Sequence, residues 1–119
     1  NIKLPVSAPF HCELMKQATE KMEKIINSQS ISEPNVKVIS NVTSIEYQNE
    51  EEIKKLLIKQ IESPVRWRES IQYMIDRGTN TFIEIGPGKV LSGLIKRINK
   101  DVKVLNIDKV EDIQIIKND

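Results

Sequence analysis

The chain has 119 residues with a formal net charge of +1, 39% hydrophobic and 29% charged, which is enough for one domain with an ordinary core. The near-neutral balance argues against a nucleic-acid partner, and no apolar run reaches the roughly 20 residues that a membrane helix needs. The single cysteine excludes an internal disulfide and fits a reducing compartment, so we expect a cytoplasmic protein.

The first half of the chain predicts extended and helical segments in turn. Residues 2–7 are expected to be extended, since Pro5 confines this segment to an edge strand or a strand start. From His11 onward, apolar residues recur every three or four positions, which predicts a helix with one buried stripe made of Leu14, Ala18, Met22 and Ile25 or Ile26. Residues 36–42 are apolar and β-branched and predict a strand. Residues 50–61 predict a second helix that begins with three glutamates.

The second half continues the alternation. A third helix is predicted from Trp67 to a terminating glycine, Gly78. The remaining elements follow in order: a strand over 81–85, a tight turn at Gly86-Pro87-Gly88, a helix over 90–98 and a strand over 102–107. This order indicates an α/β layer structure. Three strands are few for four helices, and the chain starts with Asn1 rather than methionine, so we expect upstream strands of a longer protein to be missing.

His11 is the only histidine and stands just after a proline-containing turn, near the predicted helix start. It is either a partly exposed residue without a role or a general base. A helix N-terminus disfavours the imidazolium, and a base near pH 7 must be neutral imidazole. The adjacent Cys12 is a poor nucleophile for it, because successive helical side chains diverge, and is expected to be a small buried filler. No Gly-x-Ser-x-Gly elbow occurs, so a catalytic His11 needs a nucleophile from outside this chain.

Other motifs point to structure rather than chemistry. The segment Gly86 to Lys89 lacks the spacing of a phosphate-binding loop, since Ile83 stands where that loop needs glycine and Val90 where it needs Ser or Thr. It predicts a strand-to-helix turn whose glycines allow tight packing, with backbone amides that could face a pocket. One histidine and one cysteine do not make a metal site. Trp67 is expected to be buried, with its neighbours Arg66 and Arg68 solvated. In the alternative interpretation, the two arginines contact an acidic partner.

Four segments resemble, in order, the malonyl-CoA:acyl-carrier-protein transacylase family. The first looks like that family's active-site histidine segment, with Pro-Val-Ser, then Phe-His, then Leu-Met. The segments are Leu4-Pro5-Val6-Ser7-Ala8-Pro9-Phe10-His11-Cys12-Glu13-Leu14-Met15, Val38 to Thr43, Gln60 to Trp67, and Glu84 to Leu91. The resemblance runs from about Leu4 to Asn106.

The resemblance implies roles for three residues. His11 matches the catalytic histidine, the general base for a serine nucleophile. Gln60 matches the position whose main-chain carbonyl orients that histidine in place of a triad carboxylate. An acceptor at one ring nitrogen fixes the tautomer and leaves the other nitrogen free to take the serine proton. Phe10 matches a position associated with selection of the acyl group, where Phe goes with malonyl, because a bulky ring leaves less room for an α-methyl group.

The resemblance also implies a fold and a reaction. Residues 8–119 would be the C-terminal part of the large subdomain of an α/β-hydrolase-like acyltransferase core, and residues 1–7 the last strand of its ferredoxin-like small subdomain. Malonyl would pass from CoA to the phosphopantetheine thiol of acyl carrier protein through a serine ester, in fatty acid biosynthesis. The partners would be malonyl-CoA, acyl carrier protein and the missing N-terminal part of the same enzyme, without a metal, bound cofactor, nucleic acid or membrane.

Two alternatives stay open. The chain could come from an acyltransferase domain of a larger synthase, or it could be a non-catalytic split-gene fragment or isolated subdomain. In each case we expect the 119 residues alone to be inactive, because the serine elbow, the carboxylate-binding arginine and the oxyanion-hole glutamine of the family are absent from them.

Overall fold

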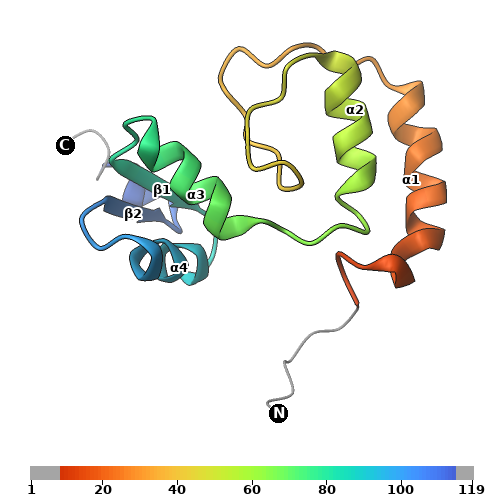
Figure 1. Cartoon of the computed structure of the whole chain (residues 1–119). Helices are drawn as coiled ribbons and strands as arrows, with labels where there is room; N and C mark the ends of the chain where they lie inside the picture. Colours follow the sequence, from red (N-terminus) through yellow and green to blue (C-terminus); the bar gives the residue numbers. More distant parts are fainter. Residues whose placement is uncertain (1–8, 115–119) are drawn as a thin grey trace. The chain divides into compact units, whose positions relative to one another are not determined.

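The structure is a computed structural model that describes residues 9–114 (Figure 1). Its residues gather into two compact units, one up to Ser70 and the other from Ile71. Residues 2–7, and with them the expected edge strand and subdomain boundary, lie outside the described part. No helix within residues 9–114 is long and apolar enough to cross a membrane.

The first unit contains helices α1 (Lys16–Ser28) and α2 (Glu50–Lys59), which run antiparallel, lie side by side and pack on each other (Figure 1). The predicted second helix is thus confirmed. Its N-cap is Asn49, whose Oδ1 accepts a hydrogen bond from the backbone amide of Glu52 at 2.9 Å. Two apolar residues one turn apart, Ile53 and Leu56, are buried on its inner face.

The first predicted helix forms with a later start and a less buried stripe than expected. A 3₁₀ turn, η1 (Glu13–Met15), precedes α1, so Leu14 lies outside the regular helix and is 78% exposed. No residue of α1 is fully buried: Ala18 and Ile26 are half-buried, and Met22 and Ile25 are exposed. The period was therefore predicted correctly, whereas the burial was not.

The strand predicted over residues 36–42 is wrong. This segment is a loop with one isolated antiparallel bridge, Ile39 to Glu46, and Val36 and Val38 are exposed. The cause is local, because the buried Ser40 hydroxyl accepts hydrogen bonds from the amides of the next residues, at 3.2 Å for Val42. A serine side chain that binds nearby amides offers the backbone an alternative to strand pairing.

The second unit is a parallel β-α-β arrangement. Strands β1 (Thr81–Ile85) and β2 (Lys103–Ile107) pair in parallel, from Thr81 opposite Lys103 to Ile85 opposite Ile107. Helix α4 (Val90–Ile98) connects them and packs on both, as parallel strands require a crossover. The core residues of this unit are Ile71, Phe82, Ile95, Val102 and Ile107. These three elements were predicted within a residue of their observed ends.

Helix α3 (Trp67–Asp76) ends at the predicted glycine. Gly78 has a φ of +92°, its amide donates to Ile75 O at 2.8 Å, and the amide of Thr79 donates to Met74 O at 3.0 Å. This pair of bonds is the Schellman arrangement, which requires a left-handed residue after the helix. After β2 the chain forms a short 3₁₀ helix, η2 (Val110–Asp112).

The Gly86-Pro87-Gly88 turn between β1 and α4 is confirmed, but the reason for its glycines differs from the prediction. Gly86 and Gly88 have φ values of +135° and +88°, and a Cβ at either would meet no atom within 4 Å. Glycine is therefore required by the backbone conformation rather than by tight packing. The turn is followed by a cap in which the Glu84 carboxylate accepts hydrogen bonds from the amides of Leu91 and Ser92 and from the Ser92 hydroxyl.

Candidate functional site

The predicted base, His11, lies in a turn just before η1, close to the predicted helix start. Its φ is +60°, an uncommon value for a residue other than glycine, and its side chain is exposed. Cys12, the next residue, makes two hydrogen bonds that stabilise this turn. Its Sγ donates to Pro9 O at 3.1 Å, and its carbonyl accepts from the amide of Met15. Cys12 is half-buried rather than a buried filler.

The structure brings together two of the three predicted site residues. His11 Nδ1 lies 2.8 Å from the main-chain carbonyl oxygen of Gln60. Because a carbonyl oxygen can only accept, Nδ1 carries the proton in this contact, and Nε2 is the nitrogen with a free lone pair. The neutral tautomer of the ring is thereby fixed.

Gln60 is free to accept because of its place in α2. It is the C-cap residue of this helix, and its own amide donates to Leu56 O at 2.9 Å. The last carbonyls of a helix have no partner within the helix, and they carry the negative end of the helix dipole. His11 thus faces the negative end of α2, and it also lies close to the start of its own helical segment, where the sequence placed it.

The structure adds a fourth residue, Asn41, to the site, and no sequence pattern pointed to this residue. Asn41 is half-buried, and its Nδ2 donates to Gln60 Oε1 at 3.2 Å. The asparagine belongs to one of the segments that resemble the transacylase family, but residue type and spacing alone gave it no role. Its contact is made across loops that are distant in sequence, so only the structure reveals it.

Phe10 adjoins His11 along the chain and is 60% exposed. The described residues of the first unit therefore do not enclose it in a pocket. The role of Phe10 in selecting the acyl group stays a prediction.

The glycine turn before α4 and the Trp67 segment have structural roles. The amides at the start of α4 are occupied by Glu84, and these hydrogen bonds, foremost that from the Ser92 side chain, lower the pKa of its carboxyl group. The turn therefore does not present these amides to an anion. Trp67 is half-buried, as against the full burial expected, and Arg66 Nε pairs with Glu69 Oε1 at 3.3 Å. Among residues 9–114, no group of three or more His, Cys, Asp or Glu side chains is placed to hold a metal ion.

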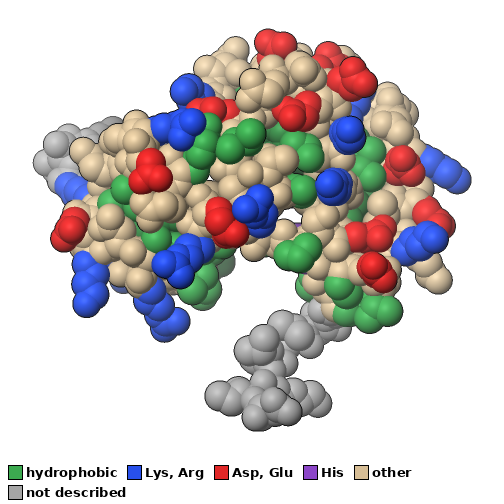
Figure 2. Space-filling model, viewed as in Figure 1, with side chains coloured by type: hydrophobic (Ala, Val, Ile, Leu, Met, Phe, Trp, Pro, Cys, Tyr) green, Lys and Arg blue, Asp and Glu red, His purple; other side chains and the backbone are tan. Residues whose placement is uncertain are grey.

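Acidic and basic side chains are interspersed on the face of the molecule that Figure 2 shows, with hydrophobic side chains between them. This distribution agrees with the formal net charge of +1.

Comparison with known proteins gives concordant results in sequence and structure. No family model matches the chain. It is 47% identical over 114 residues to the malonyl CoA-acyl carrier protein transacylase of Bacillus subtilis and 45% identical over 111 residues to that of Staphylococcus aureus. These matches cover 96% and 93% of the chain, but only 36% of each relative.

Solved structures agree. The malonyl CoA-acyl carrier protein transacylase from Clostridium perfringens superposes with a TM-score of 0.90 at 46% identity, covering 98% of this chain and 37% of that one. A malonyl transacylase in complex with its type II PKS acyl-carrier protein superposes at 0.89 with 35% identity, covering 98% and 38%. The chain thus spans about a third of its relatives, matches their C-terminal segment, and has the fold of the corresponding part of an α/β acyltransferase core.

Proposed function

We propose that this chain, a homologue of the C-terminal third of malonyl CoA-acyl carrier protein transacylases, supplies the general base of an enzyme that moves malonyl from CoA to acyl carrier protein. The observation that carries the proposal is the 2.8 Å contact between His11 Nδ1 and Gln60 O. It lies within a chain that is 45–47% identical to enzymes of that name over nearly its whole length. On this proposal residues 8–119 belong to the large subdomain and residues 1–7 end the small one.

The contact supplies what a serine nucleophile needs. A serine hydroxyl attacks a thioester only when a base removes its proton. His11 Nε2 has the free lone pair, and Gln60 O holds Nδ1–H so that this lone pair keeps its direction. The main-chain carbonyl does the orienting work that a carboxylate does in a Ser-His-Asp triad.

The reaction proceeds in two steps. In the first, a serine outside this chain attacks the malonyl-CoA carbonyl, its proton passes to His11 Nε2, the C–S bond breaks, and CoA leaves with the proton. In the second, the phosphopantetheine thiol of acyl carrier protein gives its proton to His11 and attacks the serine ester. The serine oxygen leaves and takes that proton, which restores the enzyme without a metal or bound cofactor.

The C-terminus of α2 stabilises the charge that develops on His11 in both steps. Each proton transfer leaves an imidazolium, and its positive charge faces the negative end of α2 at Gln60. A main-chain carbonyl with a partial charge is a weaker partner than a carboxylate, but it brings no ionisable group into the site. Phe10, next to His11, is proposed to contact the malonyl group and to disfavour an α-methyl substituent.

Biological context follows from the same proposal. The reaction charges acyl carrier protein with the extender unit of fatty acid biosynthesis, and its site is the bacterial cytoplasm. The partners are malonyl-CoA, acyl carrier protein and the remaining two thirds of the enzyme. The bacterial relatives and the single cysteine support this placement.

The test is transfer of radiolabelled malonyl from malonyl-CoA to phosphopantetheinylated acyl carrier protein. We expect the full-length protein that contains this segment to catalyse transfer and the 119-residue chain alone to be inactive. A full-length protein without transfer activity would support the non-catalytic alternative and overturn the proposal. Transfer by the isolated chain would mean that it contains a nucleophile of its own.

A further inference from the structure

We infer that Asn41 is a positioning residue for the proposed base, acting through Gln60 rather than on the substrate. This inference rests on the proposed function of His11. It arises from one observation, that Asn41 binds the segment from Gln60 to Arg66 at both of its ends. The side-chain Nδ2 donates to Gln60 Oε1 at 3.2 Å, and the main-chain carbonyl accepts from the amide of Arg66 at 3.0 Å.

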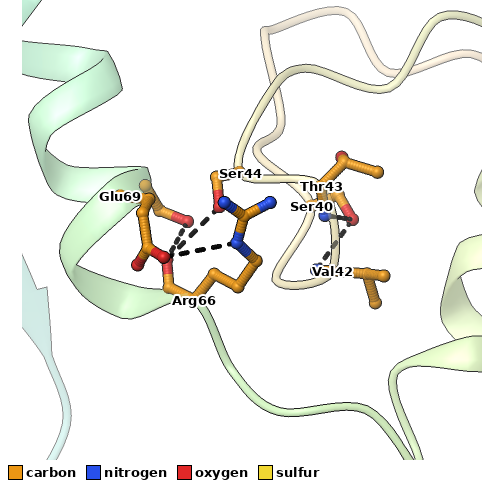
Figure 3. A network of polar contacts seen from close by, with 7 residues as sticks. Ser40, Val42, Thr43, Ser44, Arg66 and Glu69 are labelled. Carbon is orange, nitrogen blue, oxygen red and sulfur yellow. Dashed lines mark hydrogen bonds and ion pairs between the residues drawn. The ribbon is translucent and has the colours of Figure 1, made fainter.

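Asn41 can fix another residue because its own loop is fixed. It lies in the turn from Ser40 to Ser44, which Figure 3 shows from close by. The Ser40 side chain is fully buried and accepts from the amides of Val42 and Thr43. The amide of Ser44 donates to Ser40 O at 2.9 Å. Short-range bonds of this kind leave the turn few alternative conformations.

The same turn is tied to the chain that leaves α2. In Figure 3 the Ser44 hydroxyl points at Arg66, and it donates to Arg66 O at 3.5 Å. Ser70 of α3 donates to the same carbonyl from its hydroxyl at 2.8 Å and from its amide at 3.0 Å. The far end of the Gln60–Arg66 segment is thus anchored to the turn and to the first residues of α3.

The near end of the segment carries the functional atom. Gln60 is the C-cap residue of α2, and its amide still bonds to the helix at Leu56 O. Beyond Gln60 the chain is no longer helical. A residue at a helix end can swing its peptide plane more easily than one in the helix interior. The bond from Asn41 restrains the Gln60 side chain and with it the direction of the carbonyl that accepts from His11 Nδ1.

The inference predicts a modest and specific kinetic effect. Replacing Asn41 by Ala removes one neutral hydrogen bond, so kcat for malonyl transfer by the full-length enzyme should fall about three- to tenfold. The KM for malonyl-CoA should change by less than about twofold, because Asn41 is not proposed to touch substrate. Asn35→Ala, the same change at an exposed asparagine of the same unit, is the matched control and should leave both constants unchanged.

A second variant removes the other partner of the bond. Gln60→Met lacks Oε1 but keeps the size of the side chain and the main-chain carbonyl. It should reproduce the Asn41→Ala effect, and the double variant should be no slower than either single one, since both remove the same interaction. If Asn41→Ala does not fold, Gln60→Met alone decides the question, and wild-type kcat in it would overturn the inference.

A spectroscopic readout separates positioning from a purely structural role. In full-length enzyme with ¹⁵N-labelled histidine, the His11 signal is identified by its absence in His11→Gln. The wild-type ring should be in the Nδ1–H form, and Asn41→Ala should shift part of the population to the Nε2–H form. Lower thermal stability with unchanged tautomer and unchanged kcat per folded enzyme would overturn the inference. Full activity of His11→Ala would overturn the proposed function instead.

Discussion

His11 and Gln60 are 49 positions apart in sequence, yet the imidazole Nδ1 of one lies 2.8 Å from the main-chain carbonyl oxygen of the other. The contact joins a turn with a positive φ to the C-cap of a ten-residue helix. A residue held in a sparsely populated backbone region persists only where its surroundings determine it, and such residues cluster at functional sites. This relationship is the centre of the functional proposal.

The ring of Phe10 is expected to control the acyl group that is transferred. In the full-length enzyme, Phe10→Ser should reduce the preference for malonyl over methylmalonyl by about fivefold or more, because one methyl group is worth about 1–3 kcal/mol of discrimination. The measurement is the ratio of kcat/KM values for the two CoA thioesters. Leu14→Ser, at another exposed apolar residue nearby in sequence, is the control and should leave the ratio unchanged.

An unchanged ratio in Phe10→Ser would contradict the role given to this ring. A loss of transfer with both thioesters would point instead to a general part for Phe10 in holding the His11 turn.

The turn between β1 and α4 is expected to disfavour a side chain at Gly88. Gly88→Ala should lower the free energy of unfolding by about 1 kcal/mol, because its φ of +88° is costly for alanine although a Cβ would have room. Gly93→Ala is the matched control inside α4, where a Cβ also meets nothing within 4 Å. It should raise stability by up to about 1 kcal/mol. Urea unfolding curves of the two variants should therefore shift in opposite directions.

The N-cap of α2 is expected to stabilise the helix that presents Gln60. Asn49→Ala removes the acceptor for the amide of Glu52 and should cost about 1 kcal/mol of unfolding free energy. The exposed Asn35 again provides the control. If Asn49→Ala and Asn35→Ala have the same urea midpoint, the cap contributes nothing to the fold.

Stability should depend on pH through Glu84. Hydrogen bonds from Ser92 and from the amide of Leu91 hold the pKa of the Glu84 carboxyl below its usual value. A group with a lowered pKa in the folded state stabilises the fold above its unfolded-state pKa, and this stabilisation is lost as the pH falls through the folded-state pKa. Glu84→Gln should therefore be less stable than wild type near neutral pH, with the difference shrinking in acid.

Hydrogen exchange of the Leu91 and Ser92 amides, measured from neutral to acid pH, reports directly on whether the Glu84 carboxylate caps α4. Glu20→Gln, at an exposed glutamate of α1, is the charge-matched control. Equal exchange in wild type and Glu84→Gln at neutral pH would show that the carboxylate does not cap α4.

Local signals predicted those elements whose sequence pattern and burial agree. In α2, an asparagine cap, three glutamates and the buried pair Ile53 and Leu56 all favour the same helix. The β-α-β unit likewise has apolar strands and a glycine turn. Residues 36–42 failed because strand propensity is an average over side chains, whereas the Ser40 hydroxyl redirects the local amides.

The site was less accessible to local patterns. Gln60 contacts His11 through its main-chain carbonyl, and residue type carries no information about a carbonyl's direction, so only the family resemblance pointed to it. The sequence indicated the start of the helix that follows His11, but it could not place the C-terminal end of α2 beside the ring. Asn41 gave no signal at all, since its contact depends on two loops that meet only in the folded chain.

The most direct test of the account is the rate of malonyl transfer by the full-length enzyme carrying His11→Ala, measured with radiolabelled malonyl-CoA and acyl carrier protein. Loss of the base should reduce kcat/KM by about a thousandfold or more, since no other described residue is proposed to take the serine proton. The variant should remain folded, because the His11 side chain is exposed. Near-normal transfer by a folded His11→Ala enzyme would contradict the central claim that His11 is the base.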